Sequence, residues 1–272
     1  MLRSIPSPTI SALEIGPLTI HLYALCIMAG IALAIWLGDK RFKVVAPQAA
    51  SVVSEVAVTA VPFGIIGGRI YHVLTSPDAY FGAGGHPLDA LKIWEGGLGI
   101  WGAIALGTFT AWLRYRSLAQ RIELPAFTFF IDALAPGVLL AQAIGRFGNW
   151  FNVELFGRPL VAPWALEIPM IHRPFGYTQF ATFHPTFLYE AIWSTALAIV
   201  LLKIGDRLYS GQVFALYVAG YCLGRVAIES IRIDEAHHIM GLRLNVWVGI
   251  VIGLAATVIF RCLNKEADEV LG

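Results

Sequence analysis

Residues 212–232 read QVFALYVAGYCLGRVAIESIR, a run long and apolar enough to cross a membrane once, yet it contains three charged side chains. A charged side chain at the centre of a bilayer costs about 2.5–3.5 kcal/mol on insertion scales. The polar side chains share one helical face, because they are spaced by four, four and three residues: Tyr221, Arg225, Glu229 and Arg232. This face is expected to meet protein or a wet cavity. Two interpretations remain open, a functional site and an Arg225–Glu229 ion pair that braces the bundle.

The composition of the whole chain points to the same class of protein. Of 272 residues, 57% are hydrophobic and 14% are charged, and the mean hydropathy is +0.70. These values are typical of an integral membrane protein, whose natural partner is the lipid bilayer. The formal net charge of +1 argues against nucleic acid as a partner, because such binding requires a basic face that neutralises many phosphates.

Hydropathy predicts an all-α integral membrane protein, a bundle of about seven transmembrane helices. The expected spans are 18–37, 50–74, 94–113, 126–145, 186–203, 212–231 and 244–262. The connections divide Lys and Arg into ten on one side and six on the other: Lys40, Arg41, Lys43, Arg114, Arg116, Arg121, Lys203, Arg207, Arg261 and Lys265 against Arg3, Lys92, Arg158, Arg173, Arg232 and Arg243. Because cytoplasmic loops accumulate positive charge, the N-terminus is predicted outside and the C-terminus in the cytoplasm.

Residues 146–185 form the longest segment that is not expected to span the membrane. Pro159, Pro163, Pro169 and Pro174 break any long helix there, so the segment is predicted to be an extracytoplasmic cap. We find no repeat of fixed period and no low-complexity tail. The sequence therefore predicts a single membrane-embedded catalytic domain over residues 1–272, with the cap inside it.

Several common site signatures are missing or misleading. The three cysteines, Cys26, Cys222 and Cys262, form no CxxC pair, and neither HExxH nor GxSxG occurs. We therefore expect no metal site and no cofactor. Residues 97–102, GLGIWG, satisfy the pattern GxGxxG but lack the βαβ context of a dinucleotide site. Their glycines are instead expected to allow close helix packing or lipid access.

A second polar segment, GRFGNWFNVE at residues 145–154, follows the fourth predicted span. Arg146, Asn149, Asn152 and Glu154 supply donors and acceptors that lipid cannot satisfy. Taken alone, the segment is equally well interpreted as an interfacial loop whose polar groups meet water and headgroups. Together with the polar face of residues 212–232, it indicates an intramembrane site for an anionic lipid.

Other polar side chains lie near the ends of the predicted spans, and each has a simpler interpretation. Arg69 follows two glycines and could extend to the interface, and Tyr23 could belong to an aromatic belt. The segment HPTFLYE brings His184, Tyr189 and Glu190 to the start of the fifth span. There Glu190 could complement the positive end of the helix dipole.

GRFGNWFNVE together with GYxxxRxxxExxR resembles the bacterial prolipoprotein diacylglyceryl transferases, whose signature reads GRxGNxxNxE. The resemblance extends to IGPLTIHLYAL, GGRIYHV, WEGGLGIWG and HPTFLYE, and so covers most of the chain. It implies an enzyme of the bacterial plasma (inner) membrane with several membrane passes. Such an enzyme transfers the diacylglyceryl group of phosphatidylglycerol to the lipobox cysteine in the signal peptide of a preprolipoprotein, and releases glycerol phosphate.

By this resemblance, residues of the matching motifs are assigned two kinds of role. The expected catalytic residues are Arg146, Asn149, Glu154, Arg225 and Tyr23. The expected substrate-binding residues are Arg69, Asn152, His184, Tyr189, Glu190, Tyr221, Glu229 and Arg232. One departure matters: the family commonly has a histidine in an SFHGG segment, where this chain has Ile100-Trp101-Gly102. A mechanism that uses this histidine as the base is not transferable to this chain.

The proposed reaction requires a thiolate and a stabilised phosphodiester leaving group. Arg146 and Arg225 are expected to hold the phosphate, with Asn149 as a neutral donor. Because a thiol of pKa about 8.5 is largely protonated at neutral pH, a base or a cationic field is also needed. Glu154 is the first candidate, followed by His184 and Tyr23. A lipid or small-anion transporter and a structural scaffold are the alternatives.

Overall fold

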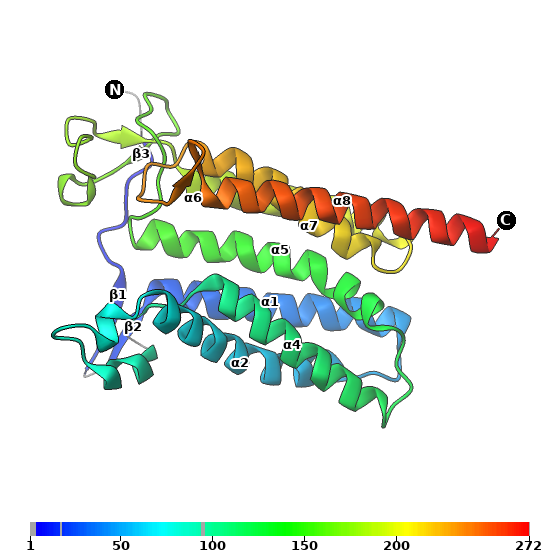
Figure 1. The fold of residues 1–272 in the computed structure, drawn as a ribbon. Helices are drawn as coiled ribbons and strands as arrows, with labels where there is room; N and C mark the ends of the chain where they lie inside the picture. The colour runs from blue at the N-terminus through cyan, green and yellow to red at the C-terminus, as the bar shows by residue number, and fades with distance from the viewer. Residues whose placement is uncertain (1–3, 17, 94–95, 272) are drawn as a thin grey trace. The chain divides into compact units, whose positions relative to one another are not determined.

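The computed structural model describes residues 4–16, 18–93 and 96–271, and long α-helices dominate it (Figure 1). Arg3, which enters the predicted charge count, lies outside the described residues. So do Pro17, Trp94 and Glu95, which belong to two of the family-like segments.

The long helices follow the order of the predicted spans. They are α1 (Leu22–Val45), α2 (Val52–Thr75), α4 (Ile100–Ala119), α5 (Phe127–Phe151), α6 (Thr186–Ile204), α7 (Gln212–Glu229) and α8 (Leu244–Leu271). Within the described part of the chain, five helices are long and apolar enough to cross a membrane: α1, α2, α5, α6 with the turn that follows it, and α8. The chain is thus a helical, multi-pass membrane protein. Membrane crossing by α4 and α7, and the orientation, stay predictions.

Short elements fill the connections between these helices. They are α3 (Asp78–Phe81), η1 (Pro87–Leu91), η3 (Met170–His172), η4 (Gly205–Arg207), β3 (Leu166–Glu167), β4 (Thr182–Phe183), β5 (His238–Ile239) and β6 (Leu242–Arg243). Strand β3 pairs with β4, and β5 pairs with β6, both antiparallel. The β3–β4 region encloses a small apolar core around Ile168 and Phe183, both fully buried.

The first predicted span begins too early. Residues 18–21 form strand β2 (Leu18–His21), which pairs antiparallel with β1 (Ala12–Ile15). The alternation of Thr and His with Leu and Ile suits this strand, so α1 begins only at Leu22.

The fourth predicted span ends too early. Helix α5 continues through Gly145 and Gly148 to Phe151. Arg146 and Asn149 therefore project from a helix, and the non-helical part of the predicted 146–185 cap begins after Phe151. A prediction from apolar residues alone underestimates the length of a helix whose last turns are polar.

The chain divides into two compact units, residues 1–38 with 131–272 and residues 39–130. In the 39–130 unit, α2 and α4 pack closely through glycines. A Cβ added to Gly67 would lie 2.3 Å from the carbonyl oxygen of Gly102, and one added to Gly102 would lie 2.1 Å from that of Gly67. Only glycine permits this approach. The GLGIWG segment thus serves helix packing, as the sequence indicates.

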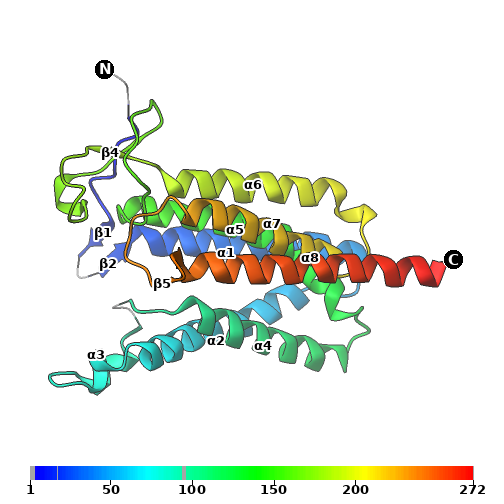
Figure 2. The ribbon, with the colours of Figure 1, turned by 45° about the horizontal axis from the view of Figure 1, so that its top comes forward.

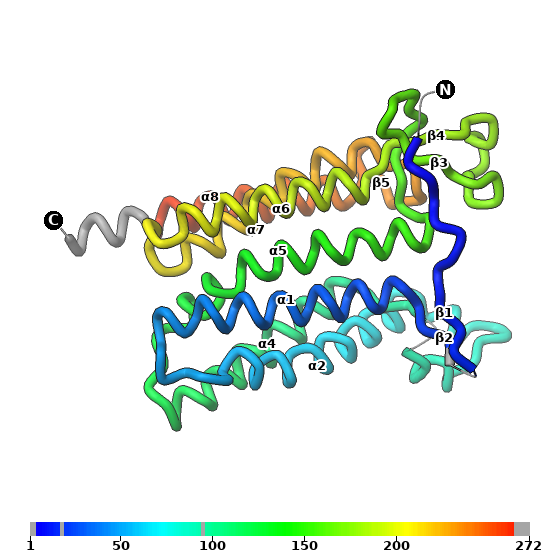
Figure 3. The backbone as a smooth tube through the Cα atoms, turned by 180° about the vertical axis from the view of Figure 1, so that it is seen from behind, coloured from blue at the N-terminus to red at the C-terminus, as the bar shows by residue number. Residues whose placement is uncertain are grey.

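In the other unit, the amino-terminal part of α1 packs against α5, where a Cβ on Gly30 would meet the backbone of Ala141 at 3.0 Å. Helix α7 packs against both α6 and α8. Helices α5, α6 and α7 enclose a core of buried apolar residues: Ala135, Leu139, Ala198, Leu201 and Val213. Figure 2 shows α5, α6, α7 and α8 running roughly parallel. The carboxyl ends of α5 and α7 and the amino ends of α6 and α8 all lie near β3, β4 and β5 (Figure 3).

Asp132 explains how α7 begins. The sequence offers no obvious partner for this carboxylate within the fourth span. In the structure, its two oxygens accept hydrogen bonds from the backbone N–H groups of Gly211 at 2.6 Å and Phe214 at 2.8 Å. Helix α7 has no side-chain cap of its own, so Asp132 of α5 satisfies donors that would otherwise be orphaned.

Substitution of Asp132 is predicted to destabilise the fold. Asp132→Ala should lower the free energy of unfolding by at least about 2 kcal/mol, because hydrogen bonds to charged groups contribute about 1.5–3 kcal/mol each. Asp132→Asn keeps one acceptor oxygen and should lose less. Thermal unfolding in detergent measures the difference, with Asp206→Ala, at an exposed carboxylate, as the control. Equal melting temperatures for all variants would contradict the capping role.

Candidate active site

Three helices contribute to a cluster of paired charges at one end of the 1–38 and 131–272 unit. Glu190 of α6 lies at its centre: Arg146 Nη2 of α5 is 2.6 Å from Oε1, and Arg225 Nη1 of α7 is 3.3 Å from Oε2. The hydroxyl of Tyr221 donates to Glu190 Oε1 at 3.1 Å. Arg146 also donates from Nη1 to Asn149 Oδ1 at 3.1 Å. The structure therefore brings together two predicted catalytic arginines from separate helices.

A second carboxylate, Glu229, is fully buried on α7. Arg225 lies 2.8 Å from Oε2, Arg232 3.1 Å from Oε2 and Arg243 2.9 Å from Oε1. Asn245 donates to Oε1 at 3.1 Å. The Arg225–Glu229 pair that the sequence offers as a structural alternative thus exists, and Arg225 links it to the Glu190 cluster.

The network extends to Asp234, in the connection between α7 and α8. Its carboxylate pairs with Arg232 at 2.7 Å and with Arg243 at 2.8 Å. Burial raises the pKa of Asp234, but its hydrogen bonds and ion pairs with the two arginines outweigh burial and leave the pKa below its ordinary value. Asp234 is therefore charged at neutral pH and completes a chain of alternating charges.

Sequence reasoning missed Asp234 and Asn245 and treated Arg243 only as a loop charge. These residues lie next to the ends of α7 and α8, where polar residues are common, so composition alone does not distinguish them. The only available signal is the proximity of Arg243 to the start of a span whose neighbouring helix carries Glu229.

Glu154 lies just beyond α5 and is exposed. Its Oε1 accepts hydrogen bonds from the side-chain amides of Asn149 at 2.9 Å and Asn152 at 3.2 Å. The backbone on both sides is strained, because Val153 and Leu155 are not glycine yet adopt φ of 53° and 59°. The amides fix the orientation of a carboxylate that stays open to an incoming group.

Tyr23 lies near the amino end of α1 and close to the same turn of α5. A Cβ added to Gly148 would approach Cβ of Tyr23 at 3.1 Å. The glycine thus lets α1 approach the turn that carries Arg146 and Asn149. The ring of His21 lies 5.7 Å from that of Tyr23.

His184 and Tyr189 form a separate pair at the start of α6. Nδ1 of His184 lies 3.1 Å from the hydroxyl of Tyr189, which also accepts a hydrogen bond from Trp164 Nε1 at 3.2 Å. Burial and the charge of Arg158 lower the pKa of His184 below its ordinary value, so its imidazole is neutral at pH 7. These contacts tie the amino end of α6 to the segment before β3.

Arg69 of α2 belongs to the 39–130 unit and is 7% exposed. Its guanidinium donates to backbone carbonyls of the connection to α4: Asp89, Ala90 at 2.8 Å, Gly96 at 2.5 Å and Gly97 at 3.2 Å. The side chain thus organises this connection, and its extension to the interface stays a prediction. Its predicted contact with substrate stays a prediction.

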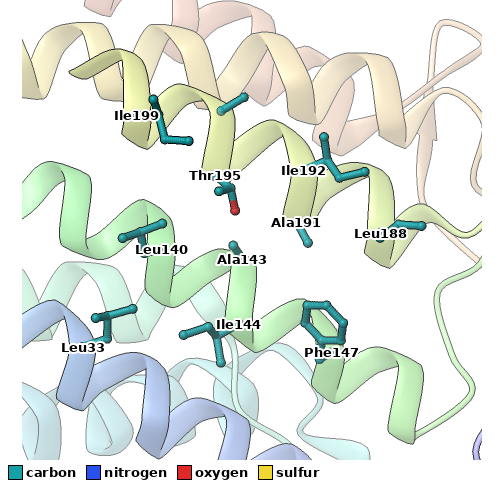
Figure 4. A pocket seen from close by; sticks show the side chains of 11 residues that line it. Leu33, Leu140, Ala143, Ile144, Phe147, Leu188, Ala191, Ile192, Thr195 and Ile199 are labelled. Atoms are coloured by element: carbon teal, nitrogen blue, oxygen red, sulfur yellow. The ribbon is translucent and has the colours of Figure 1, made fainter. Parts of the chain in front are cut away.

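Two spaces adjoin the charged cluster. One, of about 10 Å³, is lined by Arg146, Asn149, Leu155, Thr186, Phe187, Glu190 and Arg232. The other is an apolar groove of about 490 Å³ between α5 and α6, with Leu33 of α1 also on its wall (Figure 4). Phe147 and Ala191 line the groove and directly follow Arg146 and Glu190 in the sequence. On each of the two helices, the lining of the groove therefore adjoins the charged pair in the sequence.

Comparison with known proteins places the chain among relatives. The sequence profile described as "Prolipoprotein diacylglyceryl transferase" matches residues 10–262. The chain is 53% identical to phosphatidylglycerol–prolipoprotein diacylglyceryl transferase 2 of Streptomyces coelicolor, over 98% of this chain and 82% of the relative. It is 51% identical to the transferase of that name from Cutibacterium acnes, over 97% and 88% of the two chains. The chain therefore belongs to the prolipoprotein diacylglyceryl transferase family.

Proposed function

We propose that this protein transfers the diacylglyceryl group of phosphatidylglycerol to the thiol of the lipobox cysteine in the signal peptide of a preprolipoprotein. The reaction is the first step of lipoprotein maturation. Its setting is the bacterial plasma membrane, which the chain crosses with seven helices, the N-terminus outside and the C-terminus in the cytoplasm. The observation that carries the proposal is the convergence of Arg146 and Arg225 on one point, within a helical bundle of this family.

The two arginines suit a lipid phosphodiester. A guanidinium holds two oxygens of one phosphate and stays charged at any physiological pH. Each guanidinium has five N–H donors. Both terminal nitrogens of each already have a partner, Glu190 and Asn149 for Arg146 and Glu190 and Glu229 for Arg225, but each terminal nitrogen carries a second N–H that a phosphate can use. In a water-poor site such fixed donors stabilise developing negative charge strongly.

The chemical step is a displacement at carbon. The sulfur of the peptide forms a bond to the glycerol carbon of the diacylglyceryl group, and the bond from that carbon to the phosphate oxygen breaks. The electron pair of the broken bond leaves with glycerol phosphate, whose charge Arg146 and Arg225 stabilise. The thiol proton goes to Glu154, which Asn149 and Asn152 hold in place.

The apolar groove suits the acyl chains. Its lining residues come from α1, α5 and α6 and are almost entirely aliphatic or aromatic: Leu33, Leu140, Ala143, Ile144, Phe147, Leu188, Ala191, Ile192, Thr195, Ala196 and Ile199. Because Phe147 and Ala191 are the sequence neighbours of Arg146 and Glu190, a lipid in the groove has its headgroup end close to the charged cluster.

The function is tested by incubating the purified protein with phosphatidylglycerol and a lipobox peptide, and measuring the mass of the peptide by mass spectrometry. Wild-type protein is expected to add one diacylglyceryl group, whereas Arg146→Lys and Arg225→Lys should turn over about 100-fold more slowly, because an ammonium lacks the planar fork. Lys203→Arg, at an exposed position on α6, is the control. An unmodified peptide from folded wild-type protein would overturn the proposal, and release of unaltered lipid across the bilayer would favour a transporter.

Glu154→Gln tests the assignment of the base. We expect kcat to fall by about 10²–10⁴-fold, the usual contribution of a positioned base. Stability should be unchanged, because the side chain is exposed and the amide keeps an acceptor oxygen for Asn149. The slow variant should regain rate as the pH approaches the thiol pKa, which separates loss of a base from loss of shape. A variant with full activity at neutral pH would show that another group takes the proton.

Glu229 is predicted to maintain the structure. Glu229→Gln leaves Arg225, Arg232 and Arg243 without their shared counter-charge, and breaking a buried ion pair from one side costs about 3–5 kcal/mol. Thermal unfolding in detergent should show a large loss of stability, whereas Asp206→Asn should not. A Glu229→Gln protein as stable as wild type would contradict this role.

A further inference from the structure

Glu190 occupies the place that the reaction requires for a phosphate. Its two oxygens bridge Arg146 and Arg225, at 2.6 and 3.3 Å, and its residue is only 4% exposed. A carboxylate and a phosphate present paired oxygens to guanidinium groups in the same way. The space enclosed beside this cluster is only about 10 Å³. Between turnovers, one of the two positive charges of the arginine pair is therefore balanced by a side chain of the protein itself.

The charges of substrate and product make this arrangement significant. The phosphodiester of phosphatidylglycerol carries one negative charge, whereas a phosphate monoester carries about −1.5 to −2 at neutral pH. Without Glu190, Arg225 would retain only Glu229, which it shares with Arg232 and Arg243. The arginine pair would then bind the leaving glycerol phosphate more tightly than the lipid. Such a site would stabilise the transition state but retain its product.

We propose that Glu190 is the residue that releases the product: its carboxylate competes with the phosphate of glycerol phosphate for Arg146 and Arg225, and so limits the affinity of the site for a dianion. This inference rests on the function proposed above. Glu190 acts through the arginines and takes no part in bond breaking, so it is a positioning residue that selects a phosphodiester over a phosphomonoester.

The surroundings of the two buried carboxylates distinguish their roles. Glu229 is held by three guanidinium groups and an amide, which leave it no freedom to exchange partners. The contacts of Glu190 are to Arg146, Arg225 and the hydroxyl of Tyr221. Its partners are thus the phosphate-binding groups themselves, together with one neutral donor that steadies its position.

The expected consequence is product inhibition when the charge is removed. Glu190→Gln keeps the size of the side chain and an acceptor oxygen for Tyr221. We expect the inhibition constant of added glycerol phosphate to fall by about tenfold or more. We expect kcat to fall while KM for phosphatidylglycerol stays the same or falls, and the first turnover to appear as a burst of about one lipidated peptide per enzyme. Glu190→Asp retains the charge one methylene further away and should give an intermediate inhibition constant.

The outcomes of these measurements distinguish failure of product release by Glu190 from failure of the proposed transferase function. Wild-type protein that lipidates no peptide would refute the proposed function. Active wild-type protein with a Glu190→Gln variant that loses kcat but keeps the wild-type inhibition constant would refute product release and leave Glu190 a structural brace. Asp206→Asn, an exposed carboxylate beyond the opposite end of α6, should match wild type in every constant. If Glu190→Gln fails to fold, the inhibition constant of Glu190→Asp decides, and a value equal to that of wild type refutes the inference.

Discussion

The ion pairs that join α5, α6, α7 and α8 are the constraint on which the site depends. Removing a charge from water costs several kcal/mol even after relaxation, so a buried carboxylate persists only with well-placed partners. Glu190 pairs with residues of α5 and α7. Glu229 pairs with Arg243 of β6, directly before α8, and accepts a hydrogen bond from Asn245 of α8. Pairing of these charges therefore fixes the relative axial position of four helices. The same pairing places two guanidinium groups where a lipid phosphate is proposed to bind.

The interface of α5, α6 and α7 changes character along its length. Toward the end remote from β3 it is apolar, with Leu139, Leu201 and Val213 buried together. One turn before the charged cluster, Gln142 donates to the hydroxyl of Tyr217 at 3.1 Å, and Ser194 is fully buried. Hydrophobic packing stabilises the helices at the apolar end of the interface. The other end can therefore contain charged residues, although their ion pairs contribute little net stability.

The positions of the helices and the polar face of α7 could be predicted from the sequence, because a membrane span needs about 20 mostly apolar residues and polar residues within it stand out. Apolar runs located the helices, and the spacing of Tyr221, Arg225 and Glu229 predicted one polar face. The partners could not be predicted, because a spacing rule describes one helix and says nothing of the face opposite. Glu190 therefore seemed a candidate for the helix dipole, although it bridges two other helices, and Asp132 seemed isolated, although it caps α7. Likewise, no local pattern showed that the guanidinium of Arg69 is bound to loop carbonyls.

Three carboxylates in one small region have three different environments, and the environment rather than the residue type determines what each does. Glu154 is exposed and held by neutral amides, which suits its proposed role as acceptor of the thiol proton. Glu229 is buried among three guanidinium groups and is immobile, as a brace must be. Glu190 lies between these extremes, bound to the groups that a phosphate needs. An anion that binds there meets arginines that are positioned and already paired with a carboxylate, so its affinity is limited by the competition of Glu190 for the same groups.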